Sequence, residues 1–572
     1  MLKNKLFQKE MSRRRFWFWV LALIALRLAL CSQQRVYTWI DGAPLDDELM
    51  FQWAQSISAG QWLGPYDFLT LSKRPFFAVW LALLNRLGIP YLLGGQALWC
   101  AAALAGALAF APLIKKYRAR LVLFGFLCWN PAACASFTWR VYRDNIYPAL
   151  CLLFFAGLIG WLLRCPGPLK KSLGWLALAG VGLGCGWLCR EDGVWVLPFG
   201  LAALAAGLVV LWKKRETRHK ALKSLAALLP FGMLAASIGV VCALNQSWYG
   251  VAVLSDFSEG SFADAIGAMT RVKEEDWQPL VSVPTSVRQQ LYQAVPQLQP
   301  LEYWLEEDED LQNSYRNPEL DDYQSGSFYW ALRQAAQNEG VYETPQKAEE
   351  YWAGVAQAIN TLCEEGALPS EGGRRSSTTP PIRAEYVPGV LAESLRSLGY
   401  VLTCGGCQPY EAERTIGTTE DLAVWEEYLH TPTNVAAVAG TDDPYYNPLQ
   451  KGAFALLSGV RWLYALALPL SFAAGTLLWL RAGWALWKNR RQTGGESPLV
   501  WFILLAVLAM AALRIGMIAF VEVASFNIGT YVMYLATVHP LLILFSGVAC
   551  LHWGPGALRR KDSARPQQPE SV

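Results

Sequence analysis

The stretch FWFWVLALIALRLALCSQQ (residues 16–34) is followed by WIDGAPLDDE (residues 39–48), and these two segments decide the fold class. The first is an apolar run of about the 20 residues that a helix needs to cross a bilayer. It follows a cluster of Lys and Arg residues and no small-x-small cleavage site comes after it, so we interpret it as an uncleaved membrane span. The second segment places the carboxylates of Asp41, Asp46, Asp47 and Glu48 directly after that span.

The composition of the whole chain is typical of a membrane protein. Of its 572 residues, 53% are hydrophobic and only 17% are charged, which is too apolar for an ordinary soluble enzyme. About 32 of the 46 acidic residues, but only about 11 of the 49 basic ones, lie between Asp256 and Asp443. The other basic residues form short clusters between apolar runs and no continuous patch, so nucleic acid is not expected as a partner.

Apolar runs of sufficient length predict about ten membrane-spanning helices. They lie at residues 16–34, 91–113, 121–138, 146–164, 172–189, 194–212, 224–245, 453–480, 498–519 and 530–551. If the N-terminus is cytoplasmic, every second loop is basic, as the positive-inside rule requires. We therefore expect a multi-pass protein of the cell membrane with both termini in the cytoplasm.

The predicted fold class is an all-α polytopic membrane protein with four parts. These are a transmembrane module at 1–245 with surface helices at about 35–90, an acidic and mainly helical extracytoplasmic domain at 246–450, C-terminal transmembrane helices at 451–560, and a cytoplasmic tail at 561–572. The apolar stretch from Phe76 to Leu87 is too short to span, and a crossing there would invert every later loop. We predict an amphipathic helix on the outer surface for this stretch.

Charged residues gather in the short outer loops that this topology defines. An isolated charge beside the bilayer is unfavourable unless it is paired, so the loops should form one mixed basin of carboxylates and cations. Its candidate members are Asp41, Asp46, Asp47, Lys73, Arg74, Arg140, Arg143, Asp144, Arg190, Glu191 and Asp192.

Most of these residues have a structural alternative. Asp46 or Asp47 could cap the helix that follows, because the helix dipole favours a carboxylate at that end. Arg140 and Arg143 could bind a lipid phosphate bidentately, or could pair with acidic side chains nearby. The run Arg190-Glu191-Asp192 could be no more than a charged turn, and Lys73 with Arg74 could snorkel at the membrane surface.

Other signals are weaker. Arg514 lies inside an apolar run, where a charge usually faces the interior of the bundle. Cys404-Gly-Gly-Cys407 could be a redox pair or a local disulfide. The pair Tyr329-Trp330 could stack on a sugar or could belong to the core of the acidic domain. No His-based metal site is evident, although a divalent metal stays possible.

The order of these features resembles the GT-C superfamily of glycosyltransferases, which includes protein mannosyltransferases and aminoarabinose transferases. The resemblance covers about residues 10–245. It rests on an uncleaved first span, an acidic residue (Asp47) that opens a surface helix, a second surface helix at 75–88, and a later outer loop with Arg and Asp at 140–145. The His-Pro-Pro-like element of the mannosyltransferases is replaced by Lys73-Arg74-Pro75, and no Trp-Trp-Asp-Tyr-Gly motif occurs.

The resemblance implies transfer of a sugar from a polyprenyl-phosphate donor to an acceptor at the outer face, with inversion at the anomeric carbon. It implies Asp47, or Asp46, as the general base and Arg140, Arg143, Lys73 and Arg74 as the groups that hold the leaving phosphate. An inverting displacement requires such a base and such positive charge. Residues that would orient the acceptor or support the site are Asp41, Asp144, Arg190, Glu191 and Asp192.

The expected partners are the lipid-linked sugar donor, which serves as co-substrate, an envelope glycan, lipid or protein as acceptor, and membrane lipids. One rival hypothesis is a transporter or flippase for a lipid-linked envelope precursor, which predicts charges at mid-membrane and alternating access. A second is a non-catalytic scaffold whose acidic domain binds a partner or cations.

Overall fold

The computed structural model describes residues 10–40, 44–214, 217–273, 277–488, 498–527, 529 and 531–554. In these ranges the chain is almost entirely helical. The strands β1 (Arg316–Asn317) and β2 (Asp322–Tyr323) form one short antiparallel pair, and they are the only named strands of the described part. The predicted all-α fold class is confirmed.

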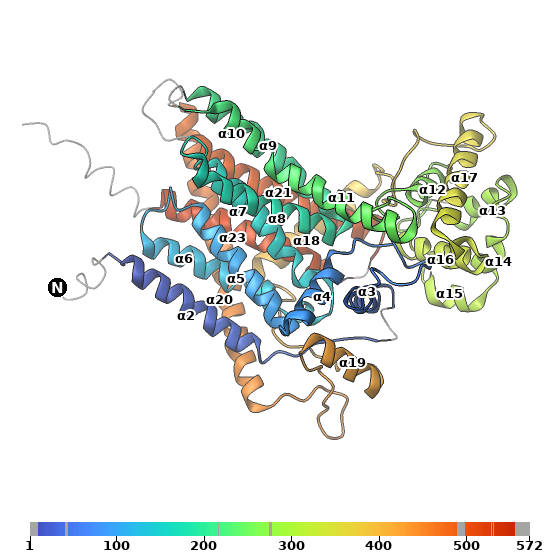
Figure 1. The fold of residues 1–572 in the computed structure, drawn as a ribbon, viewed down its shortest axis with the longest axis horizontal. Coiled ribbons are helices and arrows are strands. Elements are labelled where there is room, and N and C mark those ends of the chain that lie inside the picture. Colours follow the sequence, from blue (N-terminus) through green and yellow to red (C-terminus); the bar gives the residue numbers. More distant parts are fainter. Residues whose placement is uncertain are drawn as a thin grey trace, which may run out of the picture.

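Seven helical stretches of the described residues are long and apolar enough to cross a membrane. They are α5 (Tyr91–Ala109), α8 (Leu169–Cys189), the run Glu191–Lys213 that ends in α9 (Leu197–Lys213), the run Lys220–Tyr249 with α10 (Lys220–Ala226) and α11 (Leu229–Tyr249), α20 (Pro448–Lys488), α21 (Pro498–Ala524), and Val532–Trp553 with α23 (Val538–Trp553). Together they form one bundle, which occupies the left and centre of Figure 1. The chain is therefore a multi-pass membrane protein, as predicted.

Three other expected spans are shorter or more charged. Helix α2 (Arg13–Cys31) has 19 residues and four arginines, and α7 (Tyr147–Leu162) has 16 residues. The run 121–138 does not form one helix, because α6 (Tyr117–Cys128) ends before Pro131 and two 3-10 turns, η3 (Pro131–Cys134) and η4 (Ser136–Trp139), follow it. Proline cannot continue the hydrogen-bonding pattern of the preceding turn. The break brings residues 131–145 to the candidate site as irregular chain.

The first outer loop forms the two predicted surface helices. A π-helical turn, η2 (Pro44–Glu48), leads into α3 (Leu49–Ser58), and α4 covers Phe76–Leu87, the range expected from the sequence. Helix α4 buries Phe77, Leu81 and Leu84 along one side, which is the period of an amphipathic helix. Helices α3 and α4 pack against each other and lie between the bundle and the outer lobe (Figure 1).

A helical lobe projects from one end of the bundle (Figure 1, right). It consists of α12 (Ser261–Met269), α13 (Thr285–Ala294), α14 (Leu301–Glu306), α15 (Glu309–Tyr315), α16 (Ser325–Asn338), the 3-10 turn η7 (Val341–Glu343) and α17 (Pro345–Glu364). Its buried side chains, from Phe262 to Leu368, form a hydrophobic core separate from that of the bundle. This lobe is the first part of the predicted extracytoplasmic domain.

The second part of that predicted domain packs on the bundle instead. Helix α18 (Tyr386–Thr403) lies along α21, and α19 (Thr419–Leu429) contacts α4. Val401, Cys404, Trp425 and Leu429 belong to the hydrophobic core of the bundle. The remaining short elements are η5 (Arg143–Asn145), η6 (Glu191–Val196), α22 (Tyr531–Tyr534) and η8 (Leu535–Thr537).

Extended chain after α2 carries the first loop to the site. Val36 donates its N–H to the carbonyl of Pro432, Tyr37 donates to Trp139, and Ile40 donates to Ile416, all at 3.0–3.3 Å. Residues 36–40 thus lie between the segment before Arg140 and the chain around α19. This pairing fixes the position of the chain that precedes Asp46 and Asp47.

Candidate active site

Asp47 and Arg140 form the best-defined pair of the site. Asp47 stands on η2, a π-helical turn, a feature that is frequent at functional sites. The Nε of Arg140 donates to both carboxylate oxygens of Asp47, at 2.8 Å each. The Asp47 side chain is only 3% exposed, whereas that of Arg140 is 28% exposed. Arg140 can therefore reach a ligand while Asp47 stays in a protected position.

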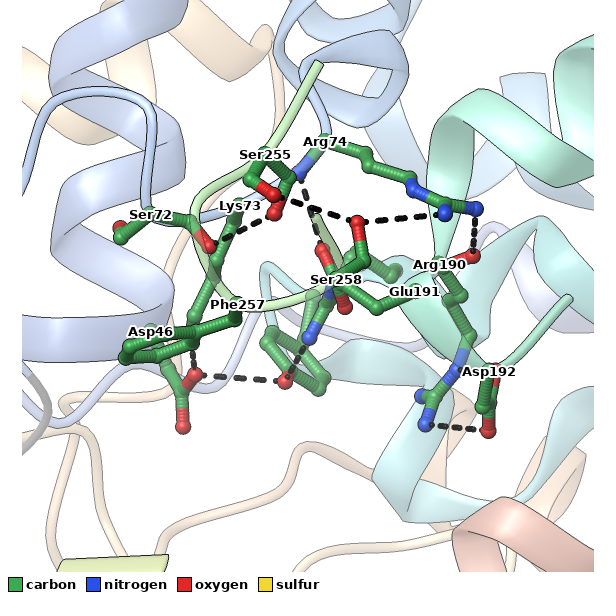
Figure 2. A network of polar contacts seen from close by, with 12 residues as sticks. Asp46, Ser72, Lys73, Arg74, Arg190, Glu191, Asp192, Ser255, Phe257 and Ser258 are labelled. Carbon is green, nitrogen blue, oxygen red and sulfur yellow. Dashed lines mark hydrogen bonds and ion pairs between the residues drawn. The ribbon is translucent and has the colours of Figure 1, made fainter. Parts of the chain in front are cut away.

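Asp46 contacts Lys73 and Tyr142 and not Arg140. Its carboxylate forms an ion pair with Lys73, and its Oδ1 accepts a hydrogen bond from the Tyr142 hydroxyl at 3.2 Å. Lys73 also donates to the Leu45 carbonyl at 2.6 Å and is 6% exposed, whereas Asp46 is 38% exposed. Figure 2 shows Lys73 directed at Asp46. Since Glu48, the N-cap residue of α3, makes no capping hydrogen bond and side chains hold both aspartates, helix capping does not explain Asp46 or Asp47.

Tyr142 connects these two pairs to the next one. Its hydroxyl accepts a hydrogen bond from Arg143 at 2.7 Å, and its ring lies within 6 Å of the cationic groups of Lys73, Arg140 and Arg143. Cations over an aromatic face are attracted by the ring quadrupole. One aromatic side chain thus places three positive charges around a common centre.

Glu191, from η6, joins the second outer loop to the segment before α4. Its Oε2 accepts from Arg143 at 2.6 Å, and its Oε1 accepts from the backbone N–H of Arg74 at 2.9 Å. The Arg74 guanidinium donates to the carbonyls of Trp187 and Arg190 and to the hydroxyl of Ser258, at 2.8–3.3 Å. Figure 2 shows this network around Arg74, Glu191 and Ser258. Within the described residues, no carboxylate lies within ion-pair distance of the Arg74 guanidinium.

A second group of ion pairs supports the first from within the bundle. Arg190 pairs with Asp144 at 2.9 Å and with Asp192 at 3.0 Å, and Asp192 also pairs with Arg514 of α21 at 2.6 Å. Arg514 and Asp144 are almost completely buried. Since buried charges must be paired, this chain of contacts connects the C-terminal end of α8 and the middle of α21 to η5.

Cations and carboxylates of the site are nearly balanced in number. Among the described residues, the cations are Lys73, Arg74, Arg140, Arg143, Arg190 and Arg514, and the carboxylates are Asp46, Asp47, Asp144, Glu191 and Asp192. An anionic ligand would bind the cations in exchange for these carboxylates.

Burial raises the pKa of Asp47 and lowers the pKa of Lys73, so both values move toward neutral pH. Desolvation raises the pKa of Asp47 above its ordinary value, although Arg140 opposes the shift. Desolvation together with the charge of Arg143 holds the pKa of Lys73 well below its ordinary value. A carboxylate with a raised pKa accepts a proton more readily near neutral pH, which is what a general base requires.

The structure brings together ten of the eleven residues expected in the basin, and Asp41 lies outside the described residues. Tyr142, whose ring organises three cations, was not among the residues expected in the site. Arg514 was expected as an inward-facing charge but not as a partner of Asp192. The Trp330 ring, for which both sugar stacking and a place in the lobe core were open, lies 5.4 Å from the Lys73 ammonium. In the described part of the chain, no group of three or more His, Cys, Asp or Glu side chains is arranged to hold a metal ion.

The chain is similar to a solved structure of a known protein. No family model and no curated protein matches the sequence. Among solved structures, the apo crystal structure of ArnT from Cupriavidus metallidurans aligns with 96% of this chain and 81% of its own, at 12% sequence identity and a TM-score of 0.28. At this TM-score the backbones do not superpose closely, so the site is defined by the contacts within this chain.

Proposed function

We propose that this protein is a membrane glycosyltransferase that moves a sugar from a polyprenyl-phosphate donor to a cell-envelope acceptor at the extracytoplasmic face, with inversion. The observation that carries the proposal is the contact of both Asp47 carboxylate oxygens with the Nε of Arg140, beside the Asp46–Lys73 pair. The contact places a protected carboxylate next to cations that can bind a phosphate. An inverting sugar transfer from a phosphate requires both a base for the acceptor hydroxyl and positive charge for the departing phosphate.

In the proposed reaction the donor phosphate binds Arg140 and Lys73, with Arg143 and Arg74 close by. Arginine binds phosphate bidentately, so the phosphate competes with Asp47 for Arg140 and frees a carboxylate oxygen. The acceptor hydroxyl oxygen then attacks the anomeric carbon from the face opposite the phosphate. Its proton passes to Asp47, the bond from the anomeric carbon to the phosphate oxygen breaks, and polyprenyl phosphate leaves with the electron pair.

The remaining charged residues would keep this arrangement rigid. Asp144, Arg190, Glu191 and Asp192 bind one another or the phosphate-binding arginines, and none of them faces the Asp46–Asp47 turn directly. Their proposed role is therefore to position Arg143 and Arg74. The cluster of arginine and lysine side chains supports a phosphate ligand.

The test is consumption of donor by the purified protein in lipid discs, supplied with a polyprenyl-phosphate-sugar pool and an envelope extract as the acceptor source. Loss of the base should reduce the rate by about 100-fold or more in Asp47→Asn, as is typical for general-base catalysis. Asp264→Asn makes the same chemical change at an exposed site on α12 and should keep the wild-type rate. The readout is mass spectrometry of donor and product.

Two outcomes would overturn the proposal. One is a wild-type rate in the double variant Asp46→Asn with Asp47→Asn, since no first-loop carboxylate would then be needed. The other is an intact donor pool together with movement of labelled donor lipid across the bilayer, which would identify a transporter.

A further inference from the structure

A second cluster of basic side chains surrounds a cavity that the candidate active site does not use. The cavity has a volume of about 440 Å³, within the range of small-molecule sites. The turn between α7 and α8 lines one side with Pro166, Gly167, Pro168 and Leu169. The other side comes from Arg218, His219, Leu222 and Lys223, at the start of α10.

The cavity lies at the opposite end of the bundle from the active site. Helix α8 begins at Leu169, in the cavity wall, and ends at Cys189, next to Arg190 of the active site. Its 21 residues extend over about 30 Å at 1.5 Å per residue. This length equals the thickness of the hydrocarbon core of a bilayer, so the cavity and the active site belong to opposite membrane surfaces.

Lys223 is the buried basic side chain of the cavity. Lys223 is 8% exposed, and its ammonium donates to the Pro166 carbonyl at 3.1 Å. Since an ammonium has three donors, two more remain for a ligand. In the part of the chain that the structure describes, no ion pair joins Arg218, His219 or Lys223 to a carboxylate. A buried cation without a counter-charge is stabilised when an anion binds beside it.

Apolar side chains continue from the mouth of the cavity along the surface of the bundle. Leu222, Leu225 and Leu228 are 46–66% exposed, and Trp212 at the end of α9 is 60% exposed. Exposed leucines on a membrane-spanning helix face lipid, and an exposed tryptophan near its end is typical of the membrane interface. A ligand in the cavity thus has positive charge at one end and a lipid-facing surface at the other.

We infer that this cavity binds the phosphate headgroup of an anionic phospholipid at the membrane surface opposite the active site. Arg218, His219 and Lys223 would contact the phosphate, and the acyl chains would lie along Leu222, Leu225 and Leu228. Basic pockets between membrane helices bind anionic headgroups in this way. The inference does not depend on the proposed transferase activity.

The test measures lipid retained by the full-length protein after purification in a neutral detergent. Native mass spectrometry should show more retained phosphatidylglycerol than phosphatidylcholine when both are supplied. The variant Arg218→Ala should reduce phosphatidylglycerol retention about fivefold, the effect of one basic charge near a membrane surface. Because Arg218 is exposed, this variant should fold normally. The matched control, Lys170→Ala with Lys171→Ala, removes two exposed charges outside the cavity and should change retention less than twofold.

Three results would overturn the inference. The first is equal retention of the two lipids by the wild type. The second is an equal loss in Arg218→Ala and in the lysine control, because the attraction would then be diffuse. The third is calorimetric binding of inorganic phosphate as tight as that of phosphatidylglycerol, which would identify a soluble phosphate as the ligand instead of a lipid.

Discussion

Asp256 and Arg333 form a buried ion pair where the outer lobe meets the first loop. Arg333 of α16 contacts Asp256 at 2.8 Å and is fully buried, and it donates to the Phe68 carbonyl at 2.7 Å. The backbone N–H of Asp256 donates to the Leu71 carbonyl at 2.9 Å. These contacts hold the chain immediately before Lys73. Asp256, which precedes the lobe, and Arg333 of α16 thus help to position Lys73 in the candidate active site.

This pair predicts a pH-dependent stability. Burial raises the pKa of Asp256 to about 6, although Arg333 opposes the shift. Because this pKa exceeds the unfolded value of about 4, the folded state binds the proton more tightly. Protonated Asp256 therefore stabilises the folded state by about 3 kcal/mol below pH 4, and this stabilisation is lost as the pH rises through 6. The variant Asp256→Asn has no titrating carboxyl at this position, so it should not show this loss of stability at higher pH.

The measurement is the thermal unfolding midpoint of the wild type and of Asp256→Asn in lipid discs at pH 4.5 and pH 7.5. The unfolding midpoint of the variant minus that of the wild type should be more positive at pH 7.5 than at pH 4.5. A difference that is the same at both pH values would contradict the raised pKa.

At the scale of single residues, the sequence could predict which charged residues share the outer face, but not how they pair or what organises them. Loop position and the requirement that charges beside a bilayer be paired were sufficient for Asp47, Arg140 and Arg190. Tyr142 could not be found in this way, because a tyrosine in a loop carries no charge and its role depends on the direction of its ring. The partner of Arg514 was hidden for another reason, since 322 residues separate Arg514 from Asp192.

The irregular segments of the chain matter more to the site than its regular helices. Asp46 and Asp47 stand on a π-helical turn, and Arg140 follows two 3-10 turns. Hydropathy predicted α4 with its bounds, since an amphipathic helix has a period that is visible in sequence. Hydropathy also predicted one continuous span at 121–138, although helix α6 ends before Pro131. A hydropathy sum does not take into account that proline has no backbone N–H to donate to the preceding turn.

Helix α16 brings one aromatic side chain of the outer lobe to the active site. The Trp330 ring lies 5.4 Å from the Lys73 ammonium and packs on the Phe257 ring at 4.6 Å. A cation–π contact of this kind contributes about 0.5–2 kcal/mol. If Lys73 binds the donor phosphate, Trp330→Ala should lower kcat/KM for the donor by about twofold to thirtyfold.

The control for this change is Trp304→Ala, which removes another indole of the same lobe. Trp304 donates to Glu339 and does not contact the active site. Steady-state kinetics with varied donor concentration should therefore separate the two variants. Equal effects of the two substitutions would indicate a general loss of lobe packing and would contradict a specific role of Trp330.

On the scale of the whole molecule, one ion pair joins the C-terminal helices to the N-terminal module. Arg514 of α21 is fully buried and contacts Asp192, which follows α8. Breaking a buried pair by removal of one partner costs about 3–5 kcal/mol, because a charge is left without compensation. Arg190 also pairs with Asp192 and keeps part of this compensation.

We therefore expect Arg514→Met to lose about 3 kcal/mol of stability, measured as a lower thermal unfolding midpoint. Arg514→Lys should recover part of the loss, since it restores the charge without the planar guanidinium. Arg481→Met is the matched control, because Arg481 is an exposed arginine on the apolar helix α20. An unchanged midpoint in Arg514→Met would show that the two modules associate without this pair.

The paired carboxylates also mean that an anion reaches a site that already contains its own counterions. To bind Lys73 or Arg140, the anion must exchange with Asp46 or Asp47. Exchange is easier at Asp46, because its carboxylate is 38% exposed and is hydrated when it is displaced. The Asp47 side chain is only 3% exposed, so its displaced carboxylate stays without water. Chloride offers one charge and no bidentate geometry, so it cannot compensate for the displacement. The resting site thus discriminates against simple monovalent anions such as chloride.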